Sequence, residues 1–225
     1  MLSLTASAWR GSLCTMNRGR FITLEGGEGA GKTTQRAALA SALRQAGLKV
    51  VETREPGGSP GAEEIRELLV QGEAGRWDAQ AEALLVCAAR RDHVQRLISP
   101  ALQRGEWVLC DRFIDSTYAY QGYGHGLDLE QLRSLNRFAI GDLKPDLTLL
   151  FDLPVEAGLA RAAERGKAQR FETLELEFHQ RVRRGFMLMA AQEPKRFAML
   201  DASQRPDEVT AAMLKVLGER LGIRV

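Results

Sequence analysis

The sequence has few cysteines, little net charge and no long apolar run. Its three cysteines, Cys14, Cys87 and Cys110, lack the spacing of metal ligands, so we expect reduced thiols in a cytoplasmic protein. No apolar stretch approaches the roughly 20 residues that a membrane-spanning helix needs. The net charge of +2 is too small to indicate a nucleic-acid or membrane-surface partner. These absences predict a cytoplasmic protein that binds neither nucleic acid nor membranes.

Residues 1–19 precede the first predicted strand and contain no acidic residue. Ser3, Thr5, Ser7 and Arg10 interrupt the apolar core that a secretory signal needs. The composition leaves an organelle transit peptide open, but we prefer a disordered extension, or an upstream start codon with Met16 as the true first residue. We predict one domain over residues 20–225, because 44% hydrophobic and 27% charged residues are typical of a globular protein.

A glycine-rich loop between a short apolar run and a predicted helix is the most informative stretch. It matches the phosphate-binding pattern G-x-x-x-x-G-K-[ST], and we assign nucleotide binding to Gly26, Gly27, Glu28, Gly29, Ala30, Gly31, Lys32, Thr33 and Thr34. Glycines let the backbone turn its N–H groups around an anion, Lys32 adds charge on the β- and γ-phosphates, and the Thr33 hydroxyl can bind Mg²⁺. The alternative is a glycine turn that binds nothing, but the strand before it and the helix after it are the context that the motif requires.

Predicted strands and helices alternate along the rest of the chain. Further strands are predicted at 48–53, 107–110, 147–153 and 197–200, and helices at 33–46, 62–70, 79–96, 129–140, 155–166, 175–192 and 206–222, with a turn at Pro100 and a loop or irregular helix at 113–126. This alternation predicts an α/β fold, a doubly wound, five-stranded parallel sheet with helices on both faces. Ligands of such folds bind at the carboxyl ends of the strands.

Arginines at strand ends indicate which class of nucleotide-binding protein this is. The sequence lacks D-x-x-G and N-K-x-D, which argues against a guanine-specific switch protein. A small-molecule kinase needs a second anion site facing the first. Arg54 and Arg112 each follow a predicted strand, Asp111 precedes Arg112, and Arg90 lies on a long helix. Each arginine taken singly is best interpreted as a surface residue, but together they indicate a second phosphate site.

The motifs together resemble those of bacterial thymidylate kinases, within the nucleoside monophosphate kinases. The resemblance covers most of the chain from Arg20 onward, through E-G-G-E-G-A-G-K-T-T, T-R-E-P-G-G, A-A-R, D-R-F-x-D-S-T-Y-A-Y-Q-G, P-D-L-T-L-x-F-D-L-P and R-A-A-E-R-G. It implies a P-loop kinase fold with a mobile lid, ATP-dependent phosphorylation of dTMP to dTDP, dependence on Mg²⁺ and a homodimer.

The resemblance also implies roles for residues that match the family by position. The dTMP-binding residues would be Arg54 and Arg112 on the phosphate, Arg90 on the thymine, Glu28 near the sugar 3′-hydroxyl, Thr117 and Gln121 in the base pocket, and Tyr120 near C2′. Lys32 and Arg112 would be catalytic, and Thr33 and Asp111 would bind Mg²⁺ directly or through water. Aromatic residues two apart, such as Tyr118 and Tyr120, are alternatively packing anchors.

Residues 165–174 resemble the lid that covers ATP in this family. No cation occurs between Gly27 and Ala30, so the resemblance implies that the lid supplies the catalytic cation. We favour Arg165 as an arginine finger, with Arg170 second, because a guanidinium brought in on closure stabilises charge on the transferring phosphoryl group. Arg161, which we assign to ATP binding, fits the solvated face of a helix at least equally well.

The sequence departs from many relatives in the predicted base pocket. Cys87 and Val86 stand three and four residues before Arg90, where relatives often have an aromatic ring. Base stacking is worth roughly 1–3 kcal/mol in single-strand binders, so we expect another residue to cover the thymine, or weaker base affinity. Two other functions stay open: a kinase for another small acceptor, and a nucleotide-dependent switch without turnover.

Overall fold

A computed structural model describes residues 18–73, 75–164, 171 and 174–223. Most of the predicted N-terminal extension lies outside these residues, as do Arg165, Arg170 and most of the predicted lid.

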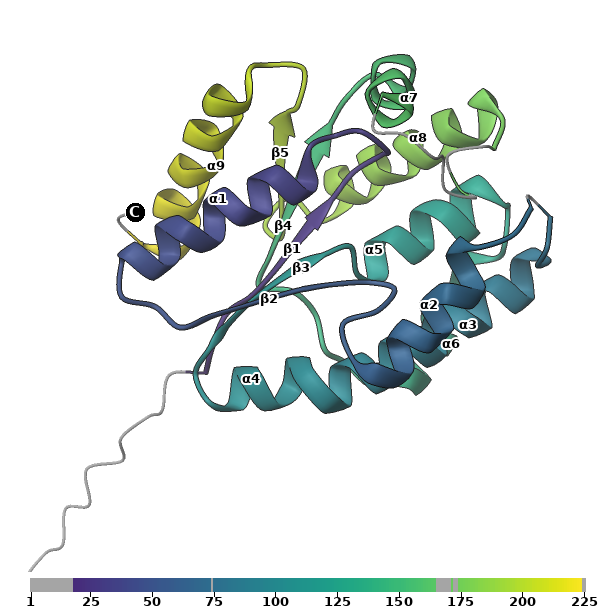
Figure 1. Ribbon diagram of the computed structural model, residues 1–225, viewed down its shortest axis with the longest axis horizontal. Coiled ribbons are helices and arrows are strands. Elements are labelled where there is room, and N and C mark those ends of the chain that lie inside the picture. Colours follow the sequence, from purple (N-terminus) through teal and green to yellow (C-terminus); the bar gives the residue numbers. More distant parts are fainter. Residues whose placement is uncertain (1–17, 74, 165–170, 172–173, 224–225) are drawn as a thin grey trace, which may run out of the picture.

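The core of the fold is a five-stranded sheet with the strand order β2-β3-β1-β4-β5, in which every neighbouring pair is parallel (Figure 1). The strands are β1 (Phe21–Glu25), β2 (Val50–Arg54), β3 (Trp107–Asp111), β4 (Leu147–Asp152) and β5 (Phe197–Asp201). All residues of β1 are buried, as expected for a central strand with both faces covered. The prediction of a five-stranded parallel sheet is therefore confirmed.

Helices cover both faces of the sheet. They are α1 (Lys32–Gln45), α2 (Pro60–Val70), α3 (Ala79–His93), α4 (Ser99–Gln103), α5 (Ile114–Thr117), α6 (Leu129–Ile140), α7 (Val155–Ala163), α8 (Leu176–Gln192) and α9 (Pro206–Leu221), with π-helical segments η1 (Val94–Ile98) and η2 (Tyr118–Gly124). On one face, Leu39 and Leu43 of α1 pack with Met213 and Leu217 of α9. On the other face, η1, α4 and α8 supply the buried side chains.

The predicted turn at Pro100 is wrong. The chain continues from α3 through η1 into α4, and Pro100 occupies the first turn of α4. A proline is tolerated there because the first turn of a helix does not use its own N–H groups, and the π-helical segment before it re-registers the backbone bonds.

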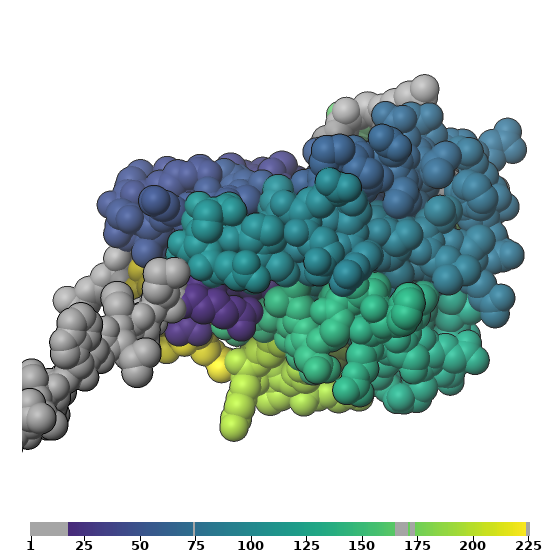
Figure 2. All heavy atoms as spheres, turned by 90° about the horizontal axis from the view of Figure 1, so that it is seen from below, coloured from purple at the N-terminus to yellow at the C-terminus, as the bar shows by residue number. Residues whose placement is uncertain are grey.

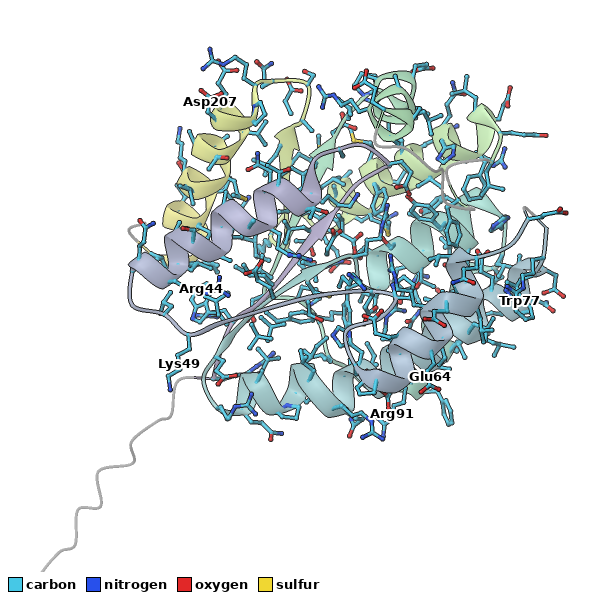
Figure 3. All side chains as sticks on the ribbon, in the orientation of Figure 1. Arg44, Lys49, Glu64, Trp77, Arg91 and Asp207 are labelled. Carbon is cyan, nitrogen blue, oxygen red and sulfur yellow. The ribbon has the colours of Figure 1, made fainter. Side chains whose placement is uncertain are left out.

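Charged side chains mostly surround this core and point outward. Arg44, Lys49 and Glu64, labelled in Figure 3, lie at the periphery of the molecule and are exposed. Lys32 and Arg90 are exceptions, because both are buried. Buried cations need hydrogen-bond acceptors or bound anions, so Lys32 and Arg90 indicate where a functional site could lie.

The phosphate-binding loop lies directly against α7. A Cβ on Gly158 of α7 would lie 2.3 Å from the carbonyl oxygen of Glu28, and one on Gly29 would lie 2.0 Å from the carbonyl oxygen of Gly158. Both distances are far below normal contact, so the loop can hold this position only because both residues are glycine. Helix α7 thus supports the loop from one side.

This packing predicts that Gly158→Ala destabilises the protein, although alanine favours helix by roughly 1 kcal/mol. The added methyl group displaces the loop, so we expect a net loss of about 1–3 kcal/mol and weaker ATP binding. Gly218→Ala in α9 is the matched control. Its Cβ would meet nothing closer than 3.4 Å, so this substitution should stabilise the protein slightly. Urea unfolding and ATP titration measure both, and equal stability of the two variants would contradict the prediction.

Candidate active site

Two cavities adjoin each other at the carboxyl edge of the sheet. The first, of about 280 Å³, is lined by the loop residues 28–34 together with Asp111, Arg112 and Arg161. The second, of about 110 Å³, is lined by Glu28, Glu55, Pro56, Arg66, Val70, Val86, Arg90, Arg112, Phe113, Ser116, Thr117, Tyr120, Gln121 and Phe171. Glu28 and Arg112 line both cavities, so two ligands bound in them would meet at these two side chains.

Lys32 is at the start of α1, in the loop that lines the first cavity. Its Nζ donates to the carbonyl oxygens of Gly26 at 3.0 Å and Gly27 at 2.8 Å. Burial and the nearby charge of Arg112 lower the pKa of Lys32 to about 8, although Asp111 and Glu28 oppose the shift. An anion in the first cavity would favour the charged form of this lysine.

Asp111 and Thr33 form the part of the first cavity that could hold a metal ion. Thr33 Oγ1 donates to Asp111 Oδ2 at 3.3 Å, and Asp111 Oδ1 is buried without a hydrogen-bond partner among the described residues. Carboxylate and hydroxyl oxygens are ligands that Mg²⁺ accepts, usually alongside phosphates and water. The described part of the chain contains no group of three or more His, Cys, Asp or Glu that could hold an ion alone, so phosphate oxygens would supply much of the coordination.

Arg112 and Glu28 form an ion pair where the two cavities meet. Arg112 Nη2 donates to Glu28 Oε1 at 2.8 Å, and the Tyr120 hydroxyl donates to the same oxygen at 2.7 Å. Burial alone would raise the pKa of Glu28, but Arg112, Lys32 and the Tyr120 hydrogen bond outweigh it and lower the pKa to about 2. Glu28 is therefore ionised and holds the guanidinium in place.

Arg54 and Arg66 are placed differently from each other. Arg54 extends from the end of β2, where its Nη2 donates to Glu63 at 3.0 Å, and it lines neither cavity. Arg66, which the sequence analysis missed, lines the second cavity and donates to the carbonyl oxygen of Pro56 at 2.8 Å. Burial and the charges of Arg54 and Arg112 lower the pKa of Arg66. The helical spacing of the sequence could have indicated that Arg66 faces inward. It lies four residues after Ala62 and three before Leu69, the buried positions of α2.

Arg90 is a buried residue in the wall of the second cavity. Its Nε donates to Glu55 Oε2 at 2.7 Å, Nη1 to Asn136 Oδ1 at 2.5 Å and Nη2 to the carbonyl oxygen of Phe113 at 3.1 Å. Burial disfavours its charge, but Glu55 more than compensates and raises the pKa of Arg90. Glu55 and Asn136 were not predicted, and an acceptor for a buried arginine has no local sequence signal.

The remaining predicted residues of the second cavity are also brought together. Thr117 Oγ1 is buried and has no hydrogen-bond partner among the described residues, so it can bond a ligand. Gln121 Nε2 donates to Glu82 Oε1 at 2.7 Å. Val86 lines the cavity without an aromatic ring, and the rings in the wall come instead from Phe113, Tyr120 and Phe171.

Arg161 of α7 reaches the first cavity. Its Nη1 donates to the carbonyl oxygen of Ala202 at 3.0 Å, after β5. Arg165 and Arg170 lie outside the described residues.

Comparisons with known proteins give matches over most of the chain. A family model for thymidylate kinase matches residues 24–213. The chain is 53% identical over 208 residues to a thymidylate kinase of Caulobacter vibrioides, covering 92% of this chain and all of the relative. It is 55% identical over 205 residues to one of Rhizorhabdus wittichii, covering 90% and 99%. A crystal structure of thymidylate kinase from Ehrlichia chaffeensis matches with a TM-score of 0.73 and 38% identity, covering 89% of this chain and 99% of that one.

The pKa of Lys32, lowered to about 8, predicts that ATP binding takes up a proton. At about pH 9 the free lysine is mostly neutral and triphosphate oxygens would charge it, whereas at about pH 6.5 it is charged in both states. We expect uptake of nearly one proton at the higher pH and none by this group at the lower one. Calorimetry in buffers of different ionisation enthalpy measures this, with Lys32→Met as control. Equal uptake by both proteins would refute the prediction.

Proposed function

The chain belongs to the thymidylate kinase family and phosphorylates dTMP to dTDP with ATP as the donor, and from this we propose that the first cavity binds ATP and the second binds dTMP. One observation carries the proposal: Arg112 and Glu28 line both cavities, so the guanidinium of Arg112 stands between the donor and acceptor phosphates. This arrangement suits direct in-line transfer.

The chemistry requires positioning and charge neutralisation. The attacking atom is a phosphate oxygen that is already an anion, so the transfer needs neither a covalent enzyme intermediate nor a general base. Lys32 binds the β- and γ-phosphates, and Arg112 stabilises the charge that spreads over the transferring group. The remaining loop residues, 26–31, 33 and 34, bind ATP through backbone N–H groups and the Thr33 hydroxyl.

The second cavity offers contacts for each part of dTMP. Arg112 and Arg66 bind the phosphate, and Arg54 joins them when its guanidinium leaves Glu63. At the other end, Arg90, Thr117 and Gln121 contact the thymine, and the unpartnered Thr117 hydroxyl supports this placement. Tyr120 and Glu28 lie between the two ends, beside the sugar. Val86 stands where many relatives have an aromatic residue, and the rings of Phe113 and Phe171 in the cavity wall take over its contact with the base.

We assign Mg²⁺ to Thr33 and Asp111, since Asp111 Oδ1 is buried and has no hydrogen-bond partner among the described residues. When bound, the ion neutralises charge on the β- and γ-phosphate oxygens. Asp111 holds its carboxylate at this point because it ends β3, beside Leu24 of β1.

A homodimer is the proposed assembly, and the cytoplasm the proposed location. Helices α2, α3 and α6 lie beside one another at one end of the molecule (Figure 2) and carry exposed apolar side chains: Leu68, Leu84 and Phe138. Phe138, 88% exposed, is the side chain that a partner subunit would most readily cover. In the described part of the chain no helix has the length and apolar character to cross a membrane.

The position of Arg112 predicts that Arg112→Ala slows dTMP-dependent formation of ADP by about 10²–10³-fold in kcat/KM, because one preorganised donor is lost. Arg104→Ala is the matched control, since that arginine is exposed and pairs with Glu106 before β3, at the opposite edge of the sheet. Steady-state assays with dTMP, dUMP, UMP and CMP test both variants. An unchanged rate in Arg112→Ala, or equal rates with all four acceptors, would refute the placement.

Arg165→Ala should reduce turnover far more than nucleotide affinity. A guanidinium that acts in the transition state contributes roughly 10³-fold or more to kcat and little to binding of the ground state. Arg161→Ala is the control. Arg161 donates to the backbone carbonyl oxygen of Ala202, and we expect its replacement to lower ATP affinity only. Equal losses of turnover and affinity in Arg165→Ala would show a binding role alone.

A further inference from the structure

Arg112 has an unusual backbone conformation. Its φ is +68°, and no other non-glycine residue in the described ranges has a positive φ. Side chains with a Cβ rarely adopt this left-handed conformation, so the surrounding contacts must hold it. Because the turn at Arg112 aims the guanidinium, those contacts also decide where the guanidinium lies.

Glu25 supplies two of these contacts. It is the last residue of β1 and is completely buried. Its Oε1 accepts from the backbone N–H of Phe113 at 2.8 Å, and its Oε2 accepts from Ser116 Oγ at 2.6 Å. The carboxylate therefore bonds the residue that directly follows Arg112 and a hydroxyl one helical turn further on.

The same hydroxyl connects Glu25 to the guanidinium. Arg112 Nη1 donates to Ser116 Oγ at 3.2 Å and to the carbonyl oxygen of Gly26 at 3.2 Å. The Arg112 backbone N–H donates to the carbonyl oxygen of Leu24 at 2.9 Å. The end of β1 thus contacts Arg112 at its backbone and at its side chain.

We propose that Glu25 is a positioning residue for phosphoryl transfer, whose carboxyl group fixes both the left-handed turn and the guanidinium of Arg112. Glu25 lines neither substrate cavity, so it acts through Arg112 and touches no substrate. The inference rests on the proposed function of Arg112.

The hydrogen bonds of Glu25, more than its charge, support this role. Burial and the neighbouring carboxylate of Asp115 raise the pKa of Glu25 to about 8, while Ser116, Arg112 and the Phe113 N–H lower it, so the side chain is ionised only above about pH 8. A buried carboxylate is unfavourable unless donors face it. Among the described residues, the hydrogen-bond donors to Glu25 are the Phe113 N–H and the Ser116 hydroxyl, and both belong to the segment that follows Arg112.

A double-mutant cycle between Glu25 and Arg112 tests the proposal. We expect Glu25→Ala to lower kcat by about 10–100-fold in the wild-type background, because small displacements of a catalytic group are costly. In the Arg112→Ala background we expect less than about a twofold effect, since the residue on which Glu25 acts is gone. A merely structural role would give the same factor in both backgrounds, and that result would overturn the inference.

Two further variants keep the test decisive. Glu25→Gln retains an acceptor for Phe113 but presents an amide N–H to Ser116. At about pH 9, where Glu25 is ionised, we expect a loss of about 3–10-fold that vanishes with Arg112→Ala, even if Glu25→Ala does not fold. Asp146→Ala is the matched control, because Asp146 accepts from the Phe21 N–H at 2.7 Å at the opposite end of β1. The kcat of this variant should equal that of the wild type.

The experiment distinguishes the role of Glu25 from that of Arg112. If Arg112→Ala leaves kcat unchanged, the proposed function of Arg112 is wrong and the inference falls with it. If Arg112→Ala lowers kcat but Glu25→Ala does not, or does so equally in both backgrounds, only the role of Glu25 is wrong.

Discussion

The ion pair between Arg112 and Glu28 is the interaction on which the rest of the site depends. It occupies the boundary of the two cavities, and the acceptors of Arg112 come from the phosphate loop and from the segment after β3. In the proposed function, the guanidinium is therefore already oriented toward the place where negative charge develops during phosphoryl transfer. Preorganisation of this kind is effective because the enzyme does not have to reorient its dipoles as the reaction proceeds.

Positive charge is concentrated around this pair. Burial together with repulsion between neighbouring cations lowers the pKa of Lys32 and of Arg66. Glu28 and Asp111 offset part of that charge. In the proposed function, the phosphates of ATP and dTMP supply the negative charge that this set of cations attracts, although the protein as a whole is nearly neutral.

A chain of buried polar side chains supports Arg90 in the wall of the second cavity. Thr53 Oγ1 lies 2.7 Å from His93 Nε2, and His93 Nδ1 lies 3.0 Å from Glu55 Oε1, whose other oxygen accepts from Arg90. Each group is buried and bonded, so Arg90 has little freedom to move. A rigid donor suits the proposed recognition of a planar base. A base that cannot accept its hydrogen bond would leave the buried donor unpaired and would bind more weakly.

By itself the sequence determined the parallel sheet, the phosphate loop at its edge and most of the residues that line the cavities. Those features depend on local patterns: the alternation of strands and helices, and residue types at strand ends. The sequence did not reveal Arg66, the Glu55–Arg90–Asn136 bonds, the pairing of Arg54 with Glu63, or the support of Arg112 by Glu25. Each of these depends on side chains from separate elements, up to 91 residues apart for Glu25 and Ser116, and only their packing around the sheet brings them within hydrogen-bond distance.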